Sequence, residues 1–125
     1  MRCYFSSEKP GPPDEPGSGY VAFVIPEMKI TFRARYHGSA TECEYASLLA
    51  LLEFVDINPR VFEGKVVEVL GDSLAVVHQV NNLLPSRKEL ENFYATAMLM
   101  KKRIPYTISW IPPADNPAGS YILSQ

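Results

Sequence analysis

Cysteine and histidine side chains often act as metal ligands, bases or nucleophiles, and this chain contains two of each. Cys3 and Cys43 are far apart and form no Cys-x-x-Cys pair, and no histidine lies near them at ligand spacing. We therefore expect two buried free thiols, with a zinc site or a disulfide as the alternatives. His78 lies among valines in a predicted short helix, which favours a polar helix side chain over a general base or metal ligand. His37 precedes Gly38 and is expected in a loop.

Two acidic residues begin predicted helices, and each has a structural explanation as well as a chemical one. Glu44 is the last residue of a Thr41-x-x-Glu44 pattern, which is typical of a capping box at a helix start. Asp72 follows an apolar strand and could cap a helix that begins at Ser73. At this point the sequence leaves both a capping role and a role in a functional site open.

The composition indicates one globular domain over residues 1–125. Hydrophobic residues make up 46% of the chain and charged residues 21%, which are ordinary values and exclude a disordered tail or a coiled coil. No apolar stretch approaches the ~18 residues that a membrane span requires, and the N-terminus lacks the apolar region of a signal peptide. We therefore expect a cytoplasmic protein without a membrane partner. The net charge of −2 means that nucleic-acid binding would need a local basic patch.

The first third of the chain has the pattern of a three-stranded antiparallel meander. Residues 2–6 and 20–25 are rich in β-favouring side chains, and residues 29–36 alternate between apolar and polar. Between the first two predicted strands, residues 8–19 are dense in proline and glycine, which predicts a loop.

The rest of the chain alternates between helical and strand periodicity. Helices are predicted from Thr41 to about Val55, over residues 74–80, and from a second capping box, Ser86-x-x-Glu89, to residue 103. Strands are predicted over residues 65–70 and 106–111, and a short C-terminal helix is possible. The order βββ-α-β-α-α-β predicts an α/β fold, in which a five-stranded mixed sheet has helices packed on it.

Three segments resemble the ribonuclease H family. Residues 44–51, EYASLLAL, are similar to the acidic start of that family's first helix. Residues 67–80, VEVLGDSLAVVHQV, resemble its Asp-Ser at a strand end followed by a helix with a glutamine. Residues 108–112 and 116–118 resemble its last strand and the asparagine that precedes its final acidic residue. The element order agrees along nearly the whole chain, so the resemblance implies a ribonuclease H-like fold.

The resemblance also implies a nuclease site, but this chain departs from it at two of four positions. Members of the family hold two divalent metal ions with four carboxylates, which fall by position on Ser6, Glu44, Asp72 and Ser120. Two of these residues are serine, and neither serine has an adjacent base in the sequence that would make it a nucleophile. In addition, Ser6-Ser7 replaces the family's Asp-Gly pair.

The two serines predict a degenerate metal site. Glu44 and Asp72 together supply a charge of −2 against the +4 of two magnesium ions, and a neutral hydroxyl is a poor ligand for a hard cation. Ser6 stands where the family has the carboxylate shared by both metals. At most one weakly held Mg²⁺ or Mn²⁺ is expected, and hence a catalytically degenerate domain that binds nucleic acid or a protein.

Two alternatives remain open. Glu8 faces the same side of the predicted strand as Ser6, roughly 7 Å further on, and Asp115 precedes Asn116. If either completes the site, the domain would be a metal-dependent endonuclease that cleaves the RNA strand of RNA/DNA hybrids. Alternatively, the acidic composition suits an assembly subunit that does not bind nucleic acid.

Basic residues flank the predicted long helix on both sides. The resemblance implies that such side chains could contact the phosphates of a hybrid duplex, whereas interleaved acids also suit an ordinary solvated helix. The candidates are Arg87, Lys88, Lys101, Lys102 and Arg103.

Overall fold

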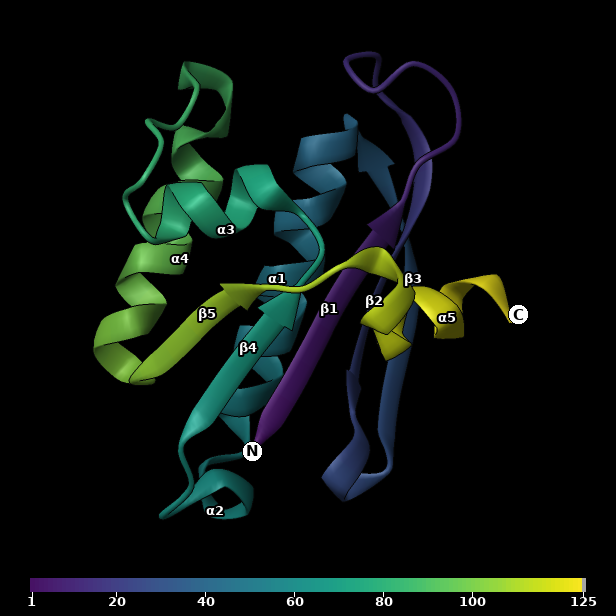
Figure 1. Ribbon diagram of the computed structural model, residues 1–125. Coiled ribbons are helices and arrows are strands. Elements are labelled where there is room, and N and C mark those ends of the chain that lie inside the picture. Colours follow the sequence, from purple (N-terminus) through teal and green to yellow (C-terminus); the bar gives the residue numbers. More distant parts are fainter. Residues whose placement is uncertain (125) are drawn as a thin grey trace.

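Five strands form one mixed sheet. They are β1 (Arg2–Glu8), β2 (Gly17–Ile25), β3 (Ile30–Gly38), β4 (Val67–Gly71) and β5 (Tyr106–Trp110). Their spatial order in the computed structural model, which describes residues 1–124, is β3-β2-β1-β4-β5 (Figure 1). The pairs β1–β2 and β2–β3 are antiparallel, and β1–β4 and β4–β5 are parallel. The predicted meander and mixed sheet are therefore confirmed.

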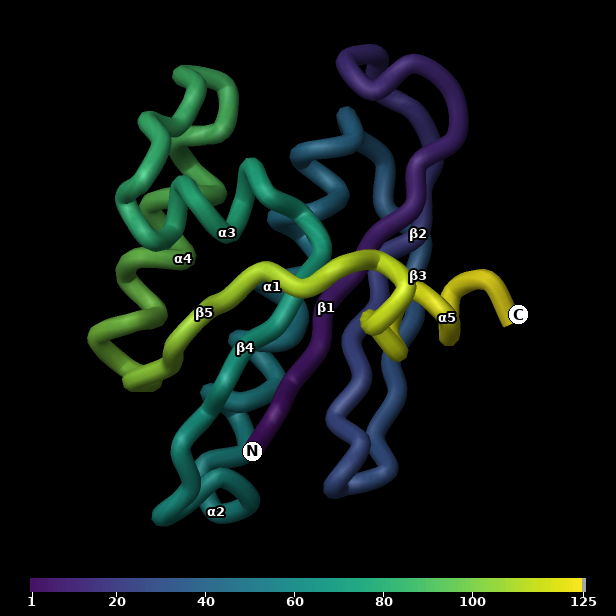
Figure 2. Tube along the Cα trace, in the orientation of Figure 1, coloured from purple at the N-terminus to yellow at the C-terminus, as the bar shows by residue number. Residues whose placement is uncertain are grey.

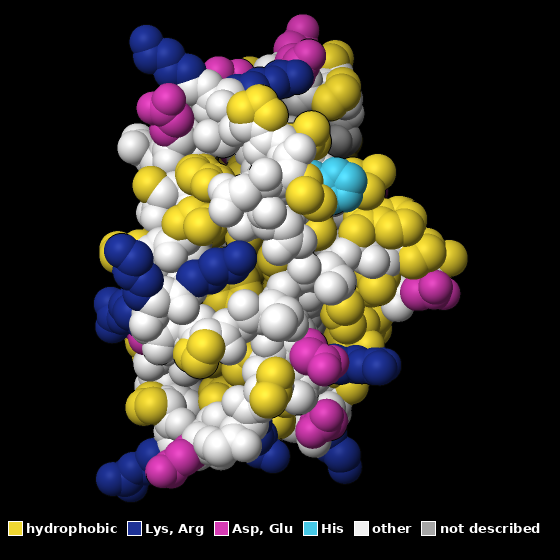
Figure 3. Space-filling view, turned by 60° about the vertical axis from the view of Figure 1, so that its left-hand side comes forward, with side chains coloured by type: hydrophobic (Ala, Val, Ile, Leu, Met, Phe, Trp, Pro, Cys, Tyr) yellow, Lys and Arg dark blue, Asp and Glu magenta, His cyan; other side chains and the backbone are white. Residues whose placement is uncertain are grey.

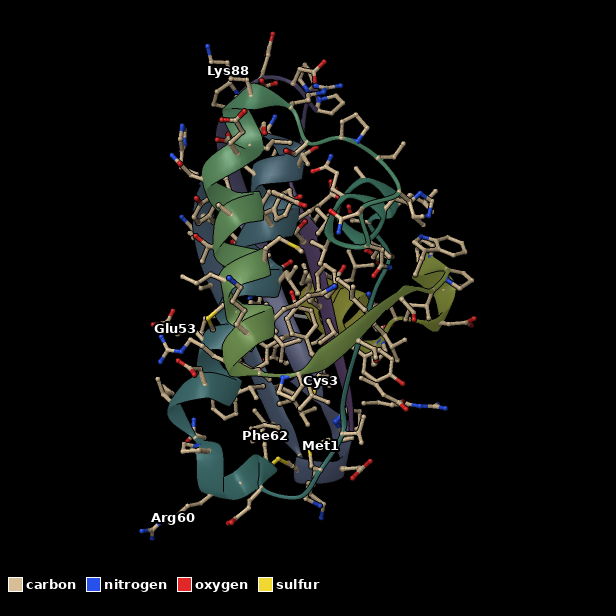
Figure 4. All side chains as sticks on the ribbon, turned by 90° about the vertical axis from the view of Figure 1, so that its left-hand side faces the viewer. Met1, Cys3, Glu53, Arg60, Phe62 and Lys88 are labelled. Atoms are coloured by element: carbon tan, nitrogen blue, oxygen red, sulfur yellow. The ribbon has the colours of Figure 1, made fainter. Side chains whose placement is uncertain are left out.

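Helices cover both faces of the sheet. The α-helices are α1 (Ala40–Ile57), α2 (Pro59–Phe62), α3 (Leu74–Val80), α4 (Glu91–Arg103) and α5 (Pro117–Leu123), and the short 3₁₀ turns are η1 (Pro26–Met28), η2 (Lys88–Leu90) and η3 (Pro113–Asp115). Seen from the β5 edge, α1 and α4 lie on one side of the sheet, which we call the inner face (Figure 4). α5 contacts β1 and β2 from the opposite side, the outer face (Figure 1).

The core lies between the inner face and α1. Successive residues of a strand point to opposite faces, so Phe5 and Phe23 face α1 whereas Ser6 and Ala22 face α5. The buried side of α1 includes Leu48, Leu51, Leu52 and Val55, which recur at helical spacing as predicted.

Both cysteines are buried free thiols, as predicted. Cys3 lies in the interior behind α4 (Figure 4). Burial raises the pKa of the Cys3 thiol to about 11, and it also raises the pKa of Cys43. The two thiols are therefore protonated and unreactive at neutral pH.

A close approach between β1 and β4 requires a glycine. A Cβ added at Gly71 would lie 2.3 Å from two ring carbons of Phe5. Phe5 and Gly71 are register partners, and because Gly71 has no side chain, the Phe5 ring can lie directly against the neighbouring strand. The next residues, Ser6 within β1 and Asp72 just after β4, lie side by side where the parallel pairing of the two strands ends.

Both predicted capping boxes are wrong. α1 begins two residues earlier than expected, with Ser39 as its N-cap and a capping box closed by Glu42 rather than by Glu44. The second long helix starts at Glu91, after the 3₁₀ turn of η2, and its N-cap Leu90 makes no side-chain cap bond. The Leu90 side chain, at the end of η2, is buried in the core. Its burial fixes the position at which α4 begins.

Most other boundaries moved by a few residues. The β1–β2 ladder continues to the pair Glu8–Tyr20 and the β2–β3 ladder to the pair Gly17–Gly38, so both β1 and β2 are longer and the proline loop is shorter than predicted. His37 lies in β3 and not in a loop, because it pairs with Ser18 of β2. The predicted strand from residue 65 begins at Val67, since Val66 is exposed. The C-terminal helix is confirmed as α5. Within residues 1–124, no helix is long and apolar enough to cross a membrane.

Candidate functional site

Ser6 and Asp72 meet at the carboxyl ends of two adjacent parallel strands. The Ser6 hydroxyl donates to the Asp72 carboxylate, with 3.2 Å from Oγ to Oδ2 and 3.4 Å to Oδ1. Ser6 is only 4% exposed, so its hydroxyl has little access to water. The Ser6 hydroxyl is therefore engaged as a hydrogen-bond donor to Asp72.

Asp72 is a partly buried carboxylate held by neutral donors. Burial raises the pKa of Asp72 above its usual range, and hydrogen bonds from the side chains of Ser6 and Asn116 oppose that rise. Ser73, not Asp72, caps α3, because its side chain accepts a hydrogen bond from the Val76 amide at 3.2 Å. A capping role for Asp72 is thus excluded.

Glu44 reaches the same place from α1. Burial raises the pKa of the Glu44 carboxyl, a hydrogen bond from the Ser73 side chain lowers it, and the charge of Asp72 raises it. Since Glu42 closes the capping box, Glu44 has no part in capping either. The two acids chosen from the sequence therefore lie close enough for the charge of Asp72 to disfavour the ionisation of Glu44.

Asn116 fastens the start of α5 to β1. Its side chain is almost fully buried, donates to the Phe5 carbonyl at 2.9 Å and accepts from the Ala118 amide at 3.0 Å. The segment that leads to it crosses the ends of β4 and β1 (Figure 2), where the Ile111 amide also donates to the Gly71 carbonyl. α5 is thereby held against Ser6 and Asp72.

Gly119, rather than Ser120, is the α5 position that faces this pair. A Cβ added at Gly119 would lie 3.4 Å from Ser6 Oγ and 3.8 Å from Asp72 Oδ2, which are ordinary contact distances. The Ser120 side chain is exposed and its hydroxyl donates to the Asn116 carbonyl at 3.5 Å. Adjacent residues of a helix point about 100° apart, so only one of them can aim at the site.

These residues line a cleft of about 480 Å³. One side of the cleft is formed by Ser6, Ser7, Glu8 and Asp72, and the other by residues of the β5–α5 segment and of α5, including Gly119 and Ser120. Glu8 thus lies at the cleft as expected, whereas Asp115 lines a different recess with Arg2 and Glu68. Within residues 1–124, no group of three or more His, Cys, Asp or Glu side chains is arranged to hold a metal ion.

The similarity of this chain to known proteins lies in its structure. No family model and no curated protein matches this chain. The ribonuclease H1 of the archaeon Halobacterium salinarum has a TM-score of 0.78 over 96% of this chain and 91% of its own, at 20% identity. LC11-RNase H1 from compost, solved with an RNA/DNA hybrid, has a TM-score of 0.78 over 95% and 91%, at 22% identity.

A third match is the foamy viral protease-reverse transcriptase in complex with double-stranded DNA. Its TM-score is 0.60 over 95% of this chain and 88% of its own, at 16% identity. The chain has the ribonuclease H fold. The fold class predicted from the sequence is therefore confirmed, and the roles of individual residues stay predictions.

On this ribonuclease H fold, most of the predicted basic contacts have partners within the chain. Arg103 forms an ion pair with Asp56 at 2.9 Å, and Arg87 lies 3.8 Å from Asp14. The Lys101 ammonium donates to the Val80 carbonyl at 3.3 Å and lies over the Tyr106 ring.

Lys88 and Lys102 are the two exposed candidates for which no ion pair is found within residues 1–124. They lie near opposite ends of α4, which is roughly 20 Å long. The Lys and Arg side chains visible in Figure 3 form several separate groups. Together these observations weaken the hypothesis that α4 presents one basic patch.

Gly119 is the site residue that sequence reasoning missed. Counting four residues from Asn116 selected Ser120, because it assumes a fixed offset into the last helix. The available signal was a glycine inside a predicted helix, where glycine costs about 1 kcal/mol relative to alanine. Such a residue is often explained by a close neighbour, here Ser6 and Asp72.

Proposed function

We propose that this ribonuclease H-fold domain does not hydrolyse phosphodiesters and acts as a nucleic-acid-binding module. The observation that carries the proposal is the hydrogen bond from Ser6 to Asp72. The Ser6 hydroxyl donates a hydrogen bond to the Asp72 carboxylate, and it occupies the position where the ribonuclease H family has an acid. It stabilises Asp72 without a cation.

The residues present do not fit a pair of divalent metal ions. Glu44 and Asp72 are the two partly buried carboxylates of the site, and together they supply a charge of −2 against the +4 of two divalent ions. Gly119 offers no side chain, and the Ser6 hydroxyl is engaged with Asp72. Hard cations are held mainly by anionic oxygens, so this donor set is too weak for a two-metal mechanism.

Nucleic-acid binding is supported by the fold's relatives. LC11-RNase H1 was solved with an RNA/DNA hybrid and the foamy viral enzyme with double-stranded DNA. Binding by phosphate contacts depends on surface cations rather than on catalytic carboxylates. A domain can therefore lose the metal site and keep the capacity to bind a duplex.

A second candidate function is metal-dependent cleavage of the RNA strand of a hybrid. The observation in its favour is that Glu8 lines the same cleft as Ser6 and Asp72. Its carboxylate is exposed, so a bound substrate or ion could draw it toward Asp72. Together with Glu44, which lies near Asp72, this would give three acids, one fewer than the ribonuclease H family uses.

A third candidate is protein interaction, since large hydrophobic side chains are exposed near the cleft. Leu123 lines the cleft and is 74% exposed. Trp110, whose ring nitrogen donates to the Asp72 carbonyl at 3.2 Å, is 40% exposed, and Leu74 is 50% exposed. A protein partner would bury these side chains.

The test separates binding from cleavage with one labelled RNA/DNA hybrid. Binding is measured without metal at several salt concentrations, and cleavage is then measured with Mg²⁺ and with Mn²⁺. We expect binding that weakens steeply with salt and no cleavage. Cleavage that requires metal and is abolished by both Asp72→Asn and Glu44→Gln would overturn the proposal in favour of the nuclease. Absence of salt-dependent binding would favour a protein partner.

A further inference from the structure

The outer face of β3 carries a pair of arginines stacked on a tyrosine. Arg33 and Arg35 are two residues apart in a strand, so their side chains point to the same side of the sheet. The Arg33 guanidinium lies 4.1 Å from the centre of the Tyr20 ring, and that of Arg35 lies 5.7 Å from it. Stacking on a ring face restricts a guanidinium and leaves the N–H groups at its edge available to a ligand.

Neither guanidinium has an anionic partner in the described part of the chain. The ion pairs found there involve Arg2, Arg87 and Arg103, and not Arg33 or Arg35. In addition, the Nε of Arg33 is buried and has no hydrogen-bond partner within residues 1–124. A buried donor without an acceptor costs free energy, and because this atom is closed to solvent, a ligand has to reach Arg33 through its Nη groups.

The sheet register places the two arginines beside the cleft. Ser6 pairs with Ala22, and Ala22 pairs with Arg33, so these residues form one row across the outer face. Glu8, Tyr20 and Arg35 form the next row. Neighbouring strands are about 4.8 Å apart, which puts the β3 backbone roughly 10 Å from that of β1, where Ser6 and Glu8 line the cleft.

We propose that Arg33, Arg35 and Tyr20 form a binding site for the phosphate groups of a nucleic-acid backbone, an inference that rests on the proposed function. Guanidinium groups bind phosphate oxygens through paired N–H donors. Because Arg33 covers the Tyr20 ring, that ring is not open for stacking with a base. Contacts made through phosphates alone carry no sequence information, so binding through this site is independent of base sequence.

Exposed arginines on an edge strand have another use, which the test must distinguish. β3 is at one edge of the sheet, and charged side chains there discourage pairing with a strand of another molecule. In that role the arginines need no ligand. Their replacement would then promote self-association and leave nucleic-acid binding unchanged.

The experiment measures fluorescence anisotropy of a labelled RNA/DNA hybrid, without metal, over a range of salt concentrations. We expect the double substitution Arg33→Ala with Arg35→Ala to weaken binding about tenfold at low salt. The slope of log K against log salt should fall by about 1.8, the value for two lost phosphate contacts. The matched control is Arg60→Ala with Lys65→Ala, which also removes two positive charges, but from the region around α2. In Figure 4, Arg60 and Lys88 lie at opposite ends of the molecule. The control should bind as the wild type does.

A second probe tests the site without nucleic acid. Tripolyphosphate should raise the melting temperature of the wild type and of the control, but not that of the double arginine variant. Arg33→Lys with Arg35→Lys keeps the charge and loses the paired donors, so it should recover only part of the hybrid affinity.

The outcomes separate the two proposals. If the wild type binds the hybrid and the double arginine variant binds it equally with the same slope, the phosphate site is refuted while the proposed function stands. If no hybrid binds but tripolyphosphate stabilises only proteins that retain the arginines, the anion site stands and the proposed function fails. Equal melting temperatures with and without tripolyphosphate in every protein would refute the anion site itself.

Discussion

Two regions one residue apart along β1 and β4 are held together by different interactions, the first by core packing and the second by hydrogen bonds. At Phe5 and Gly71 the strands meet in the core, where a ring fills the space left by a missing side chain. One residue further, Ser6 and Asp72 line a cleft, and the Ser6 hydroxyl donates a hydrogen bond to the Asp72 carboxylate. The first region depends on a close steric fit, whereas the second depends on a hydrogen bond between a neutral hydroxyl and a carboxylate.

The difference teaches that core packing and hydrogen bonds act side by side in positioning the cleft residues. Packing at Phe5 and the bonds of Asn116 to the Phe5 carbonyl and to α5 hold the cleft residues in place. Chemistry at the cleft can therefore change without loss of the fold, as long as the core beside it is kept.

The largest effect is expected from filling the space at Gly71. In Gly71→Ala the new Cβ would lie 2.3 Å from ring carbons of Phe5, and a residue in the middle of the sheet cannot move away. We expect a loss of about 3 kcal/mol in the free energy of unfolding, measured by urea denaturation. Adding Phe5→Leu should restore part of that loss. Full stability of Gly71→Ala alone would contradict the steric argument.

The second prediction restores acids to the cleft. Ser6→Asp with Gly119→Asp would place four carboxylates around one point, because a side chain at position 119 fits at contact distance from Ser6 and Asp72. We expect this variant to be less stable than the wild type without metal. Mn²⁺ at a hundredfold excess over its Kd should then stabilise it by about 2.7 kcal/mol, seen as a rise in Tm.

Its matched control is Ser6→Asp with Ser120→Asp, which adds the same number of acids but places the second one at an exposed position. The control should gain much less from Mn²⁺, and the wild type should gain little. Equal stabilisation of both double variants would mean that Gly119 is not the position that faces the site.

A smaller effect is expected from the hydrogen bond between Ser6 and Asp72. Ser6→Ala removes a donor to a partly buried carboxylate, which should cost about 1–2 kcal/mol at neutral pH. The same change should raise the pKa of Asp72 further, because the Ser6 hydroxyl lowers it in the wild type. Ser7→Ala makes the same chemical change one residue along the strand and should cost less. Denaturant titration of both variants, with NMR titration of the carboxyl, would check this.

The smallest effect concerns the ionised form of Glu44. Because burial raises the pKa of this carboxyl above its unfolded value, its ionisation opposes folding, and stability falls as pH rises from the unfolded to the folded pKa. Glu44→Gln should therefore be more stable than the wild type at pH 7, by less than about 1 kcal/mol, and no more stable at pH 3. Glu53→Gln, an exposed change on the same helix, serves as the control. A destabilised Glu44→Gln at pH 7 would show that the charge of Glu44 is satisfied in the native protein.

Part of this molecule was predictable because periodicity in a sequence reflects which side of an element is buried. The alternation in residues 29–36 and the helical spacing after residue 44 predicted the types and order of the longer elements correctly, but the one-turn helix α2 (Pro59–Phe62) was missed. The capping boxes failed for a related reason. Ser39 and Thr41 both have an acid three residues later, and local sequence does not say which pair closes the first turn.

The sequence by itself determined the βββ-α-β-α-α-β order, the burial of both cysteines, and the choice of Glu44 and Asp72 as the acids of interest. These follow from residue types and local spacing, which act within a few positions of the chain. Only the tertiary structure decided that Gly119 lies against Ser6 and Asp72, and that Arg33 and Arg35 lie in rows with Ser6 and Glu8. Such relations depend on the rotation of a packed helix and on the register of paired strands, and both are set by contacts between segments far apart in the chain.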